Sequence, residues 1–386
     1  PGSTRRRSRK DLLFAGTETG IYISWNGGKN WKSFNLNFPV TPVTDLIIRH
    51  GDLIIATAGR SFWVLDDLEM IRQYKKDNNT LNLYKPADVL LGNWGSSLNG
   101  SSSNGTDPFV GVNPANGLVT YYSLPELPKD TEVVLEIKDS NGYLVRRISS
   151  KEDKSFQKYP GGPSAEPKLS ANKGVNRFVW DLRYPTLLGA PTAYIEGAFH
   201  GHKVSPGNYT MTLKAGAKEV GSDFSVLSNP LYEISNETYA EYDAFMKSTT
   251  AHFNEMHTKV NAMLKMRKKI DEVLKDFPEN EKFTVIRKNG EELITKMKAW
   301  DEDMIQRKSK AYDDVENFPN KFTSEFIFLI NSTESDLPRV NDASKKRLKE
   351  LDEQWKILKA RAMQIIDVDV PDYNNQLTEA GIGVIR

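Results

Sequence analysis

Hydrophobic and polar positions follow two different periods along this chain, and the change falls near residue 230. Before it, apolar residues come in short runs that alternate with polar ones, as in 132–138 and 208–213. A period of two is typical of β-strands with one buried face. From residue 231 onward apolar residues recur at helical spacing, which predicts amphipathic helices. The expected fold class is therefore multidomain β plus α, with β units first and an antiparallel helical bundle last.

Strand-like runs and turn signals alternate in the first β interval, residues 11–74. Gly-Thr-Glu-Thr-Gly at 16–20 and His-Gly-Asp at 50–52 are turn sequences, because glycine and short polar residues tolerate positive φ. Short strands at such spacing are typical of β-propellers and β-sandwiches. The expected strands are 12–15, 21–24, 31–34, 44–49, 53–57 and 61–65.

One turn in this interval, residues 24–31, reads Ser-Trp-Asn-Gly-Gly-Lys-Asn-Trp, and its Asn-Gly-Gly core predicts a tight hairpin. We expect the Ser24 hydroxyl to bond turn amides and the tryptophan indole to pack over the loop. The spacing resembles the Asp-box, Ser-x-Asp-x-Gly-x-Thr-Trp, of BNR, sialidase-like and sortilin-like (VPS10-related) β-propellers, with Asn26 for Asp and Asn30 for Thr. In those families the Asp-box holds a blade together and performs no chemistry.

The resemblance continues through Leu-Phe-Ala-Gly-Thr-Glu at 13–18 and Gly-Arg-Ser-Phe-Trp-Val-Leu-Asp-Asp at 59–67. It implies that residues 11–74 are the terminal blade or blades of a C-terminal fragment from a bacterial (Bacteroidetes-type) protein, secreted or periplasmic, of a group often labelled glycosyl hydrolase. An isolated blade exposes apolar faces and unpaired strand edges. We therefore expect this unit to pack on the rest of the chain or to self-associate through its edges.

Two further β and linker intervals precede the helices. Residues 75–117 are a predicted linker or loop, polar at 99–106. Residues 118–228 carry six or seven alternating runs, which predict an Ig-like β-sandwich with Trp180 in its core. The segments 174–185 and 205–210 resemble the FlgD-like domain that follows the propeller in the same family.

The helical interval, residues 231–386, contains a predicted capping box at Thr238–Glu241. The predicted helices are 238–277, 289–316, 322–330 and 343–366, separated by Phe-Pro breaks and polar turns. The residues from 370 onward resemble the natural C-terminus of the family.

Composition excludes several classes of function. Lys and Arg number 52 against 51 Asp and Glu, so no long-range field favours nucleic acid or an acidic membrane surface as the main partner. No apolar run is long enough to predict a membrane span, and the absence of cysteine excludes disulfides and thiol chemistry. Residues 1–10 are basic without an apolar stretch, and we interpret them as a cloning or vector-derived tail.

Candidate chemistry is sparse, and no cofactor motif is present. Asp66, Asp67 and Glu18 are the candidate catalytic carboxylates for glycoside hydrolysis, which needs a pair about 5–9.5 Å apart. Neighbouring strand residues point to opposite faces, so a strand-end turn is the competing interpretation for Asp66 and Asp67. Trp25 and Trp94 are candidates for stacking on a sugar ring, against a role in anchoring the loops.

Metal binding has one weak candidate pair, His200 and His202, which lie two apart on an extended segment. A site needs further ligands, and Glu196 is the nearest; a surface loop with two histidines is the competing interpretation. His252 and His257 do not converge on one helix face.

The leading hypothesis is a non-catalytic interaction or accessory module of a secreted BNR/sortilin-like protein that binds a protein or a glycan. The alternative is a glycoside hydrolase acting on polysaccharide through a carboxylate pair, with residues near Asp181 and Arg183 as a second location for its site. A third reading is a metal-dependent activity at His200 and His202.

Overall fold

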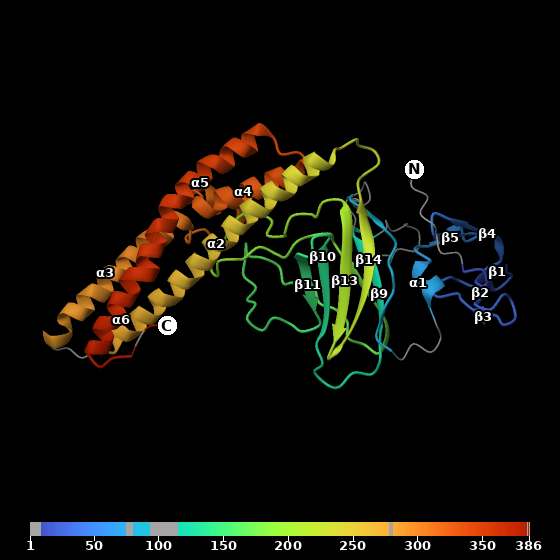
Figure 1. The fold of residues 1–386 in the computed structure, drawn as a ribbon, viewed down its shortest axis with the longest axis horizontal. Coiled ribbons are helices and arrows are strands. Elements are labelled where there is room, and N and C mark those ends of the chain that lie inside the picture. The colour runs from blue at the N-terminus through green and yellow to red at the C-terminus, as the bar shows by residue number, and fades with distance from the viewer. Residues whose placement is uncertain (1–8, 75–79, 93–114, 278–280, 384, 386) are drawn as a thin grey trace. The chain divides into compact units, whose positions relative to one another are not determined.

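The computed structural model describes residues 9–74, 80–92, 115–277, 281–383 and 385. The chain is mixed β and α, with several small sheets and a helical C-terminal region (Figure 1). It divides into two compact units. The first holds the sheets and consists of residues 1–151, 168–182 and 206–229; the second consists of 152–167, 183–205 and 230–386.

The first unit begins with two small antiparallel sheets, ordered β1-β2-β3 and β4-β5-β6. Their bounds are β1 Leu13–Thr17, β2 Gly20–Ser24, β3 Lys32–Ser33, β4 Val43–Arg49, β5 Asp52–Thr57 and β6 Phe62–Leu65, followed by helix α1 Glu69–Gln73. Ile21, Leu53, Ile55 and Leu68 are buried together between these elements. This small core forms because alternate strand residues face inward.

The β2–β3 turn is fastened by its own side chains. Ser24 Oγ accepts a hydrogen bond from the Gly28 amide at 2.9 Å, and Asn26 Oδ1 accepts one from the Asn30 amide at 2.9 Å. Gly27 and Gly28 both have positive φ, at 66° and 86°. The expected bonding of the Ser24 hydroxyl to turn amides is therefore confirmed.

A five-stranded sheet and a third three-stranded sheet complete the first unit. The five-stranded sheet has the order β11-β10-β13-β14-β8, and the other is β12-β9-β7. The bounds are β7 Asn82–Leu83, β8 Val89–Leu90, β9 Leu118–Leu124, β10 Val133–Asp139, β11 Leu144–Ser149, β12 Gly174–Trp180, β13 Gly207–Ala215 and β14 Lys218–Leu227. Trp180 is buried and packs its ring against Tyr209 and Phe224, so its predicted place in a core is confirmed.

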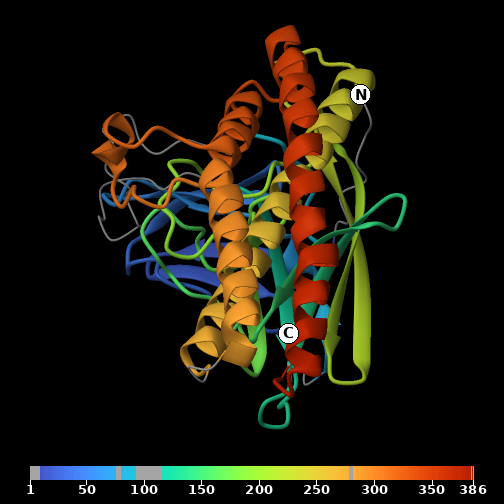
Figure 2. The ribbon, with the colours of Figure 1, turned by 90° about the vertical axis from the view of Figure 1, so that its left-hand side faces the viewer.

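The second unit is built from helices (Figure 2), and buried apolar side chains of these helices form one core. They are α2 Asn236–Lys275, α3 Glu281–Met304, η1 Tyr312–Glu316, α4 Phe322–Ser335, α5 Asp342–Met363, the π-helix η2 Gln364–Asp369 and α6 Val370–Glu379. Tyr242, Phe253 and Trp300 are among the fully buried residues of this core. Among the described residues no helix is long and apolar enough to cross a membrane.

Several predicted helix ends are wrong, including the start of α3, which is Glu281 and not 289, and the end of α4, which is Ser335 and not 330. Ser235, and not Thr238, caps α2, because its hydroxyl accepts the Thr238 amide. The second helix ends at Met304 and not at 316, since Arg307 turns back to pair with Asp301 and leaves the helical path. The last helix continues past 366 through the π-helix η2 into α6, with Pro371 near the start of α6.

An extended segment, residues 183–205, belongs to the helical unit although it lies within the interval predicted as a sandwich. We call it the strap. Leu187, Ile195 and Phe199 of the strap are buried in the helical core. Helix α2 holds the strap backbone through Asn254, which accepts the Leu188 amide, and Asn261, which donates to the Gly189 carbonyl.

Candidate functional site

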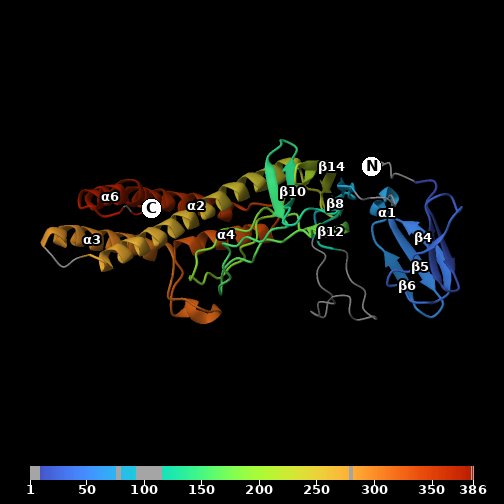
Figure 3. The same cartoon turned by 90° about the horizontal axis from the view of Figure 1, so that it is seen from below.

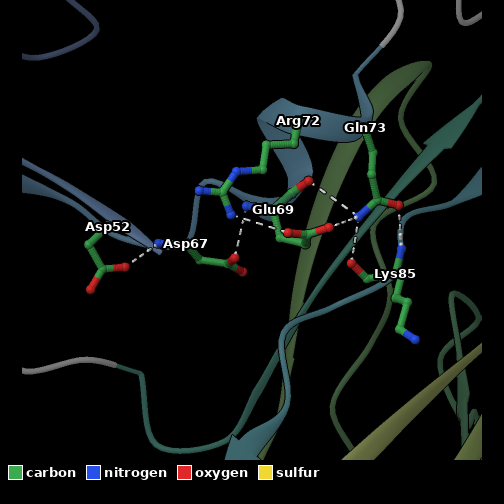
Figure 4. Close-up of polar contacts among 6 residues, drawn as sticks. All are labelled: Asp52, Asp67, Glu69, Arg72, Gln73 and Lys85. Atoms are coloured by element: carbon green, nitrogen blue, oxygen red, sulfur yellow. Dashed lines mark hydrogen bonds and ion pairs between the residues drawn. The ribbon is translucent and has the colours of Figure 1, made fainter. Parts of the chain in front are cut away.

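The predicted carboxylates Asp66 and Asp67 lie where β6 ends and α1 begins. Figure 4 shows Asp67 with its polar contacts. The Asp67 amide donates to Asp52 Oδ1 at 2.8 Å, and Asp67 Oδ1 accepts from the Glu69 amide at 3.1 Å. Asp67 also adopts a positive φ of 51°, which is uncommon for a residue with a side chain. Its carboxylate thus fastens the start of α1, as an N-terminal capping group does.

Acidic groups crowd this strand end, and two of them, Asp66 and Asp67, have raised pKa values. Burial first, and then the Asp52 carboxylate, raises the pKa of Asp66, while Arg177 opposes the shift. Burial also raises the pKa of Asp67, and the bond from the Glu69 amide opposes it. A carboxyl group with a raised pKa is what a general acid requires.

The residues beyond Asp67 tie α1 to the following chain. Arg72 Nη1 lies 3.4 Å from Glu69 Oε2. The Gln73 side chain binds both backbone groups of Lys85, accepting from its amide at 2.9 Å and donating to its carbonyl at 2.8 Å (Figure 4). The polar cluster therefore acts as a structural junction. Sequence patterns missed Asp52, whose only signal is its place at the end of a hairpin turn.

The other predicted residues of this site are not drawn into it. Glu18 is exposed in the β1–β2 turn, and no contact described for Asp66 or Asp67 involves it. Trp25 is half-buried and packs against Tyr74 with ring centroids 6.1 Å apart, so its ring is not an open platform for a sugar. Trp94 lies outside the described residues.

A second polar cluster lies in the helical unit, where the strap meets α4. Arg183 Nη1 contacts Glu334, His200 Nδ1 at 2.9 Å and the Gly201 carbonyl at 2.8 Å. The Glu334 carboxylate is nearly buried, yet its pKa is lowered, because the bonds and charges of His200 and Arg183 outweigh the effect of burial. Sequence patterns singled out Arg183 and His200 but missed Glu334, which is distant in the chain.

His202 enters a different environment from His200. Its ring stacks on Tyr184 with centroids 4.3 Å apart and meets Tyr242 edge-on. Burial lowers its pKa to about 4. Within the described part of the chain, the two ring nitrogens of His202 and the Tyr242 hydroxyl have no hydrogen-bond partner.

These two histidines do not form a metal centre with their neighbours. Across residues 9–74, 80–92, 115–277, 281–383 and 385 no group of three or more His, Cys, Asp or Glu side chains is placed to hold a metal ion. The His202 ring packs against the rings of Tyr184 and Tyr242, and His200 pairs with Arg183 and Glu334. The chemistry that this cluster supports is packing and ion pairing.

The β4-β5-β6 sheet (Figure 3) presents an apolar face opposite its small core, as the strand register and side-chain exposure show. Leu53 and Ile55 of β5 are buried, so Ile54 points to the other face. The strand register aligns Ile54 with Ile47 on one side and Val64 on the other, and these two side chains are 47% and 56% exposed. Phe62, 76% exposed, pairs with Ala56 in the next row. We call Ile47, Ile54, Phe62 and Val64 the outer face.

Comparisons with protein-family models, with curated proteins and with solved structures found no match. The function of this chain is therefore inferred from its own residues and contacts.

Proposed function

We propose that this chain is a non-catalytic interaction module that binds a protein partner through the outer face of the β4-β5-β6 sheet. The observation that carries the proposal is the alignment of exposed aliphatic and aromatic side chains in adjacent cross-strand rows. Contiguous exposed apolar surface on a folded domain is typical of interaction sites. Because the rows are two residues apart along each strand, as on the face of any sheet that packs on another, a second sheet with an aliphatic face is the partner that fits them.

The module is further proposed to be a secreted or periplasmic BNR/sortilin-like fragment, with residues 11–74 as a propeller-blade-like unit and 118–228 as an Ig-like sandwich. The Asp-box-like turn supports this, since Ser24 and Asn26 bond the amides of Gly28 and Asn30. Neighbouring blades of a propeller pack sheet on sheet, which agrees with an apolar outer face. A protein partner is favoured over a glycan, because Trp25 is engaged by Tyr74.

Partner selection tests the proposal. A displayed library of bacterial protein fragments is screened against the intact chain, and each binder is measured again with Val64→Lys and with Tyr143→Lys. Tyr143 is 71% exposed in the β10–β11 turn and serves as the control. We expect Val64→Lys to weaken binding at least tenfold and Tyr143→Lys to leave it unchanged. Binders indifferent to Val64→Lys, or binding to glycans alone, would contradict the proposal.

Glycoside hydrolysis stays the second candidate, because the pKa values of Asp66 and Asp67 are both raised beside Asp52. The carboxylates would act as a general acid and its partner at the end of β6. A panel of aryl glycosides and polysaccharides, assayed with the parent chain, Asp66→Asn and Asp67→Asn, tests it. Turnover that both variants abolish would favour the hydrolase over the interaction module.

A further inference from the structure

Strand β4 is an edge of its sheet with much of its length exposed. In the described chain it pairs with β5 on one side, and its neighbour β1 contacts its inner face, where Gly16 lies against the Val43 side chain. Ile47 and Ile48 are each 47% exposed. The strand sequence, Val-Thr-Asp-Leu-Ile-Ile-Arg, contains no lysine or proline, the residues that commonly block edge pairing.

The β4–β5 turn determines which backbone groups point to the open edge. Arg49 pairs with Asp52 across the two residues His50 and Gly51, whose φ angles are 51° and 99°. In such a hairpin the pair beside the turn is hydrogen-bonded, and bonded pairs then alternate along the ladder. The amides and carbonyls of Arg49 and Ile47 therefore point to β5, and those of Ile48 and Leu46 point outward.

The Leu46 amide supports this assignment, because it is bound outside the ladder. Asp45 Oδ1 accepts it at 2.8 Å. The Asp45 carboxylate thus covers one of the outward donors in the single chain. A register irregularity between Val43 and Asp45 limits regular pairing to residues 45–49.

We propose that β4 pairs antiparallel with β4 of a second copy, about a two-fold axis at Ile47. In this register Leu46 of one copy exchanges two backbone hydrogen bonds with Ile48 of the second copy. By symmetry, Ile48 of the first copy exchanges two more with Leu46 of the second. Asp45 then lies opposite Arg49 of the second copy, twice, in pairs that are not hydrogen-bonded and whose side chains are therefore closest. The Asp45 carboxylate moves from the Leu46 amide to this arginine.

Charge selects this register over its neighbours. A shift by two residues keeps the backbone pairing but places Ile47 opposite either Asp45 or Arg49, which leaves charges beside aliphatic groups. The selected register instead joins the rows of Val64, Ile54 and Ile47 from both copies into one continuous apolar band. The inference goes beyond the proposed function, since it uses the strand edge and leaves the outer face open to a protein partner.

Two opposite charge changes test the pairing. Sedimentation equilibrium of the intact chain is expected to show a concentration-dependent dimer. Asp45→Arg places arginines opposite arginines, and Arg49→Asp places aspartates opposite aspartates, so each variant alone is expected to sediment as a monomer. Mixed in equal amounts, the two variants restore both ion pairs in a heterodimer. We expect the mixture to recover the dimer.

Controls separate this edge from other surfaces. Lys32→Asp changes a charge on β3, the edge of the other small sheet, and is expected to leave the dimer intact. Ile48→Pro removes an outward amide without touching the β5 ladder and is expected to abolish the dimer. Circular dichroism checks that each variant is folded. A monomeric parent at the highest soluble concentration, or a dimer that both charge variants retain, would overturn the proposal.

Partner binding through the outer face and dimerisation through β4 can be refuted independently of each other. Val64→Lys alters the outer face but not the edge, and it is expected to reduce partner binding while the dimer persists. Arg49→Asp is expected to abolish the dimer while a monomer still binds the selected partner. Loss of one property therefore does not imply loss of the other.

Discussion

Asn331→Ala is the sharpest perturbation of the helical unit, because one side chain joins α4 to the strap. Asn331 Oδ1 accepts the Ala198 amide at 2.8 Å, and Asn331 Nδ2 donates to the Ala198 carbonyl at 2.9 Å. This reciprocal pair resembles the bonding of one strand residue to another. Asn331 holds the strap against α4 at a point about one helical turn before Glu334. Glu334 in turn contacts Arg183 of the strap.

The expected cost follows from those two bonds. Each contributes about 1 kcal/mol net, and the half-buried backbone groups left behind add up to about 1 kcal/mol where water does not reach them. We therefore expect Asn331→Ala to reduce the free energy of unfolding of the helical unit by about 2–3 kcal/mol. Asn331→Asp keeps the acceptor but places a carboxylate beside the Ala198 carbonyl, and it is expected to cost at least as much.

Urea unfolding followed by helical circular dichroism measures this loss, and hydrogen exchange at the Ala198 amide localises it. Ser332→Ala is the matched control, because the Ser332 hydroxyl donates only to the Leu329 carbonyl of the same helix. We expect that variant to change stability by less than about 0.5 kcal/mol. An Asn331→Ala variant as stable as Ser332→Ala, with the Ala198 amide still protected, would refute the role given to this side chain.

Three further predictions concern the turns and buried histidines. Asp67→Ala removes the acceptor of the Glu69 amide at the start of α1 and keeps a strained positive φ, so thermal unfolding is expected to show a loss of about 1–2 kcal/mol, whereas Asp67→Gly relieves the strain and is expected to be milder. Ser24→Ala removes the hydroxyl that binds the Gly28 amide and is expected to cost about 1 kcal/mol in the same assay; no change would contradict its role. His202 and His257 both have a pKa of about 4 in the fold, against about 6.5 unfolded, so stability is full above about pH 6.5 and falls as the pH decreases toward 4. In urea titrations, we expect His202→Phe to lose less unfolding free energy between about pH 7 and pH 5 than the parent chain loses. An equal loss in the two proteins would contradict the assignment.

Local pattern was sufficient for most elements of this fold, but it missed helix α1, and it missed the strands β7 and β8, which lie in the interval predicted as a linker or loop. The period of two predicted β-strands before residue 230, and the helical period predicted the apolar stripes that bury Tyr242, Phe253 and Trp300. The turn at Ser24 was predictable because its bonds join residues within four positions of each other. Helix ends were less predictable, since the end of α3 depends on Arg307 and its pairing with Asp301.

Tertiary structure decided which residues meet. The strap belongs to the helical unit because side chains of α2 and α4 bind its backbone. No periodicity in the sequence predicts that it packs there. Glu334 meets Arg183, and Asp52 meets Asp67, across intervals of chain that only folding closes. The outer face and the open edge of β4 likewise depend on strand order and register. Sequence by itself therefore determined most of the elements, because their signals are local, while the candidate sites are long-range pairings that only the packed chain specifies.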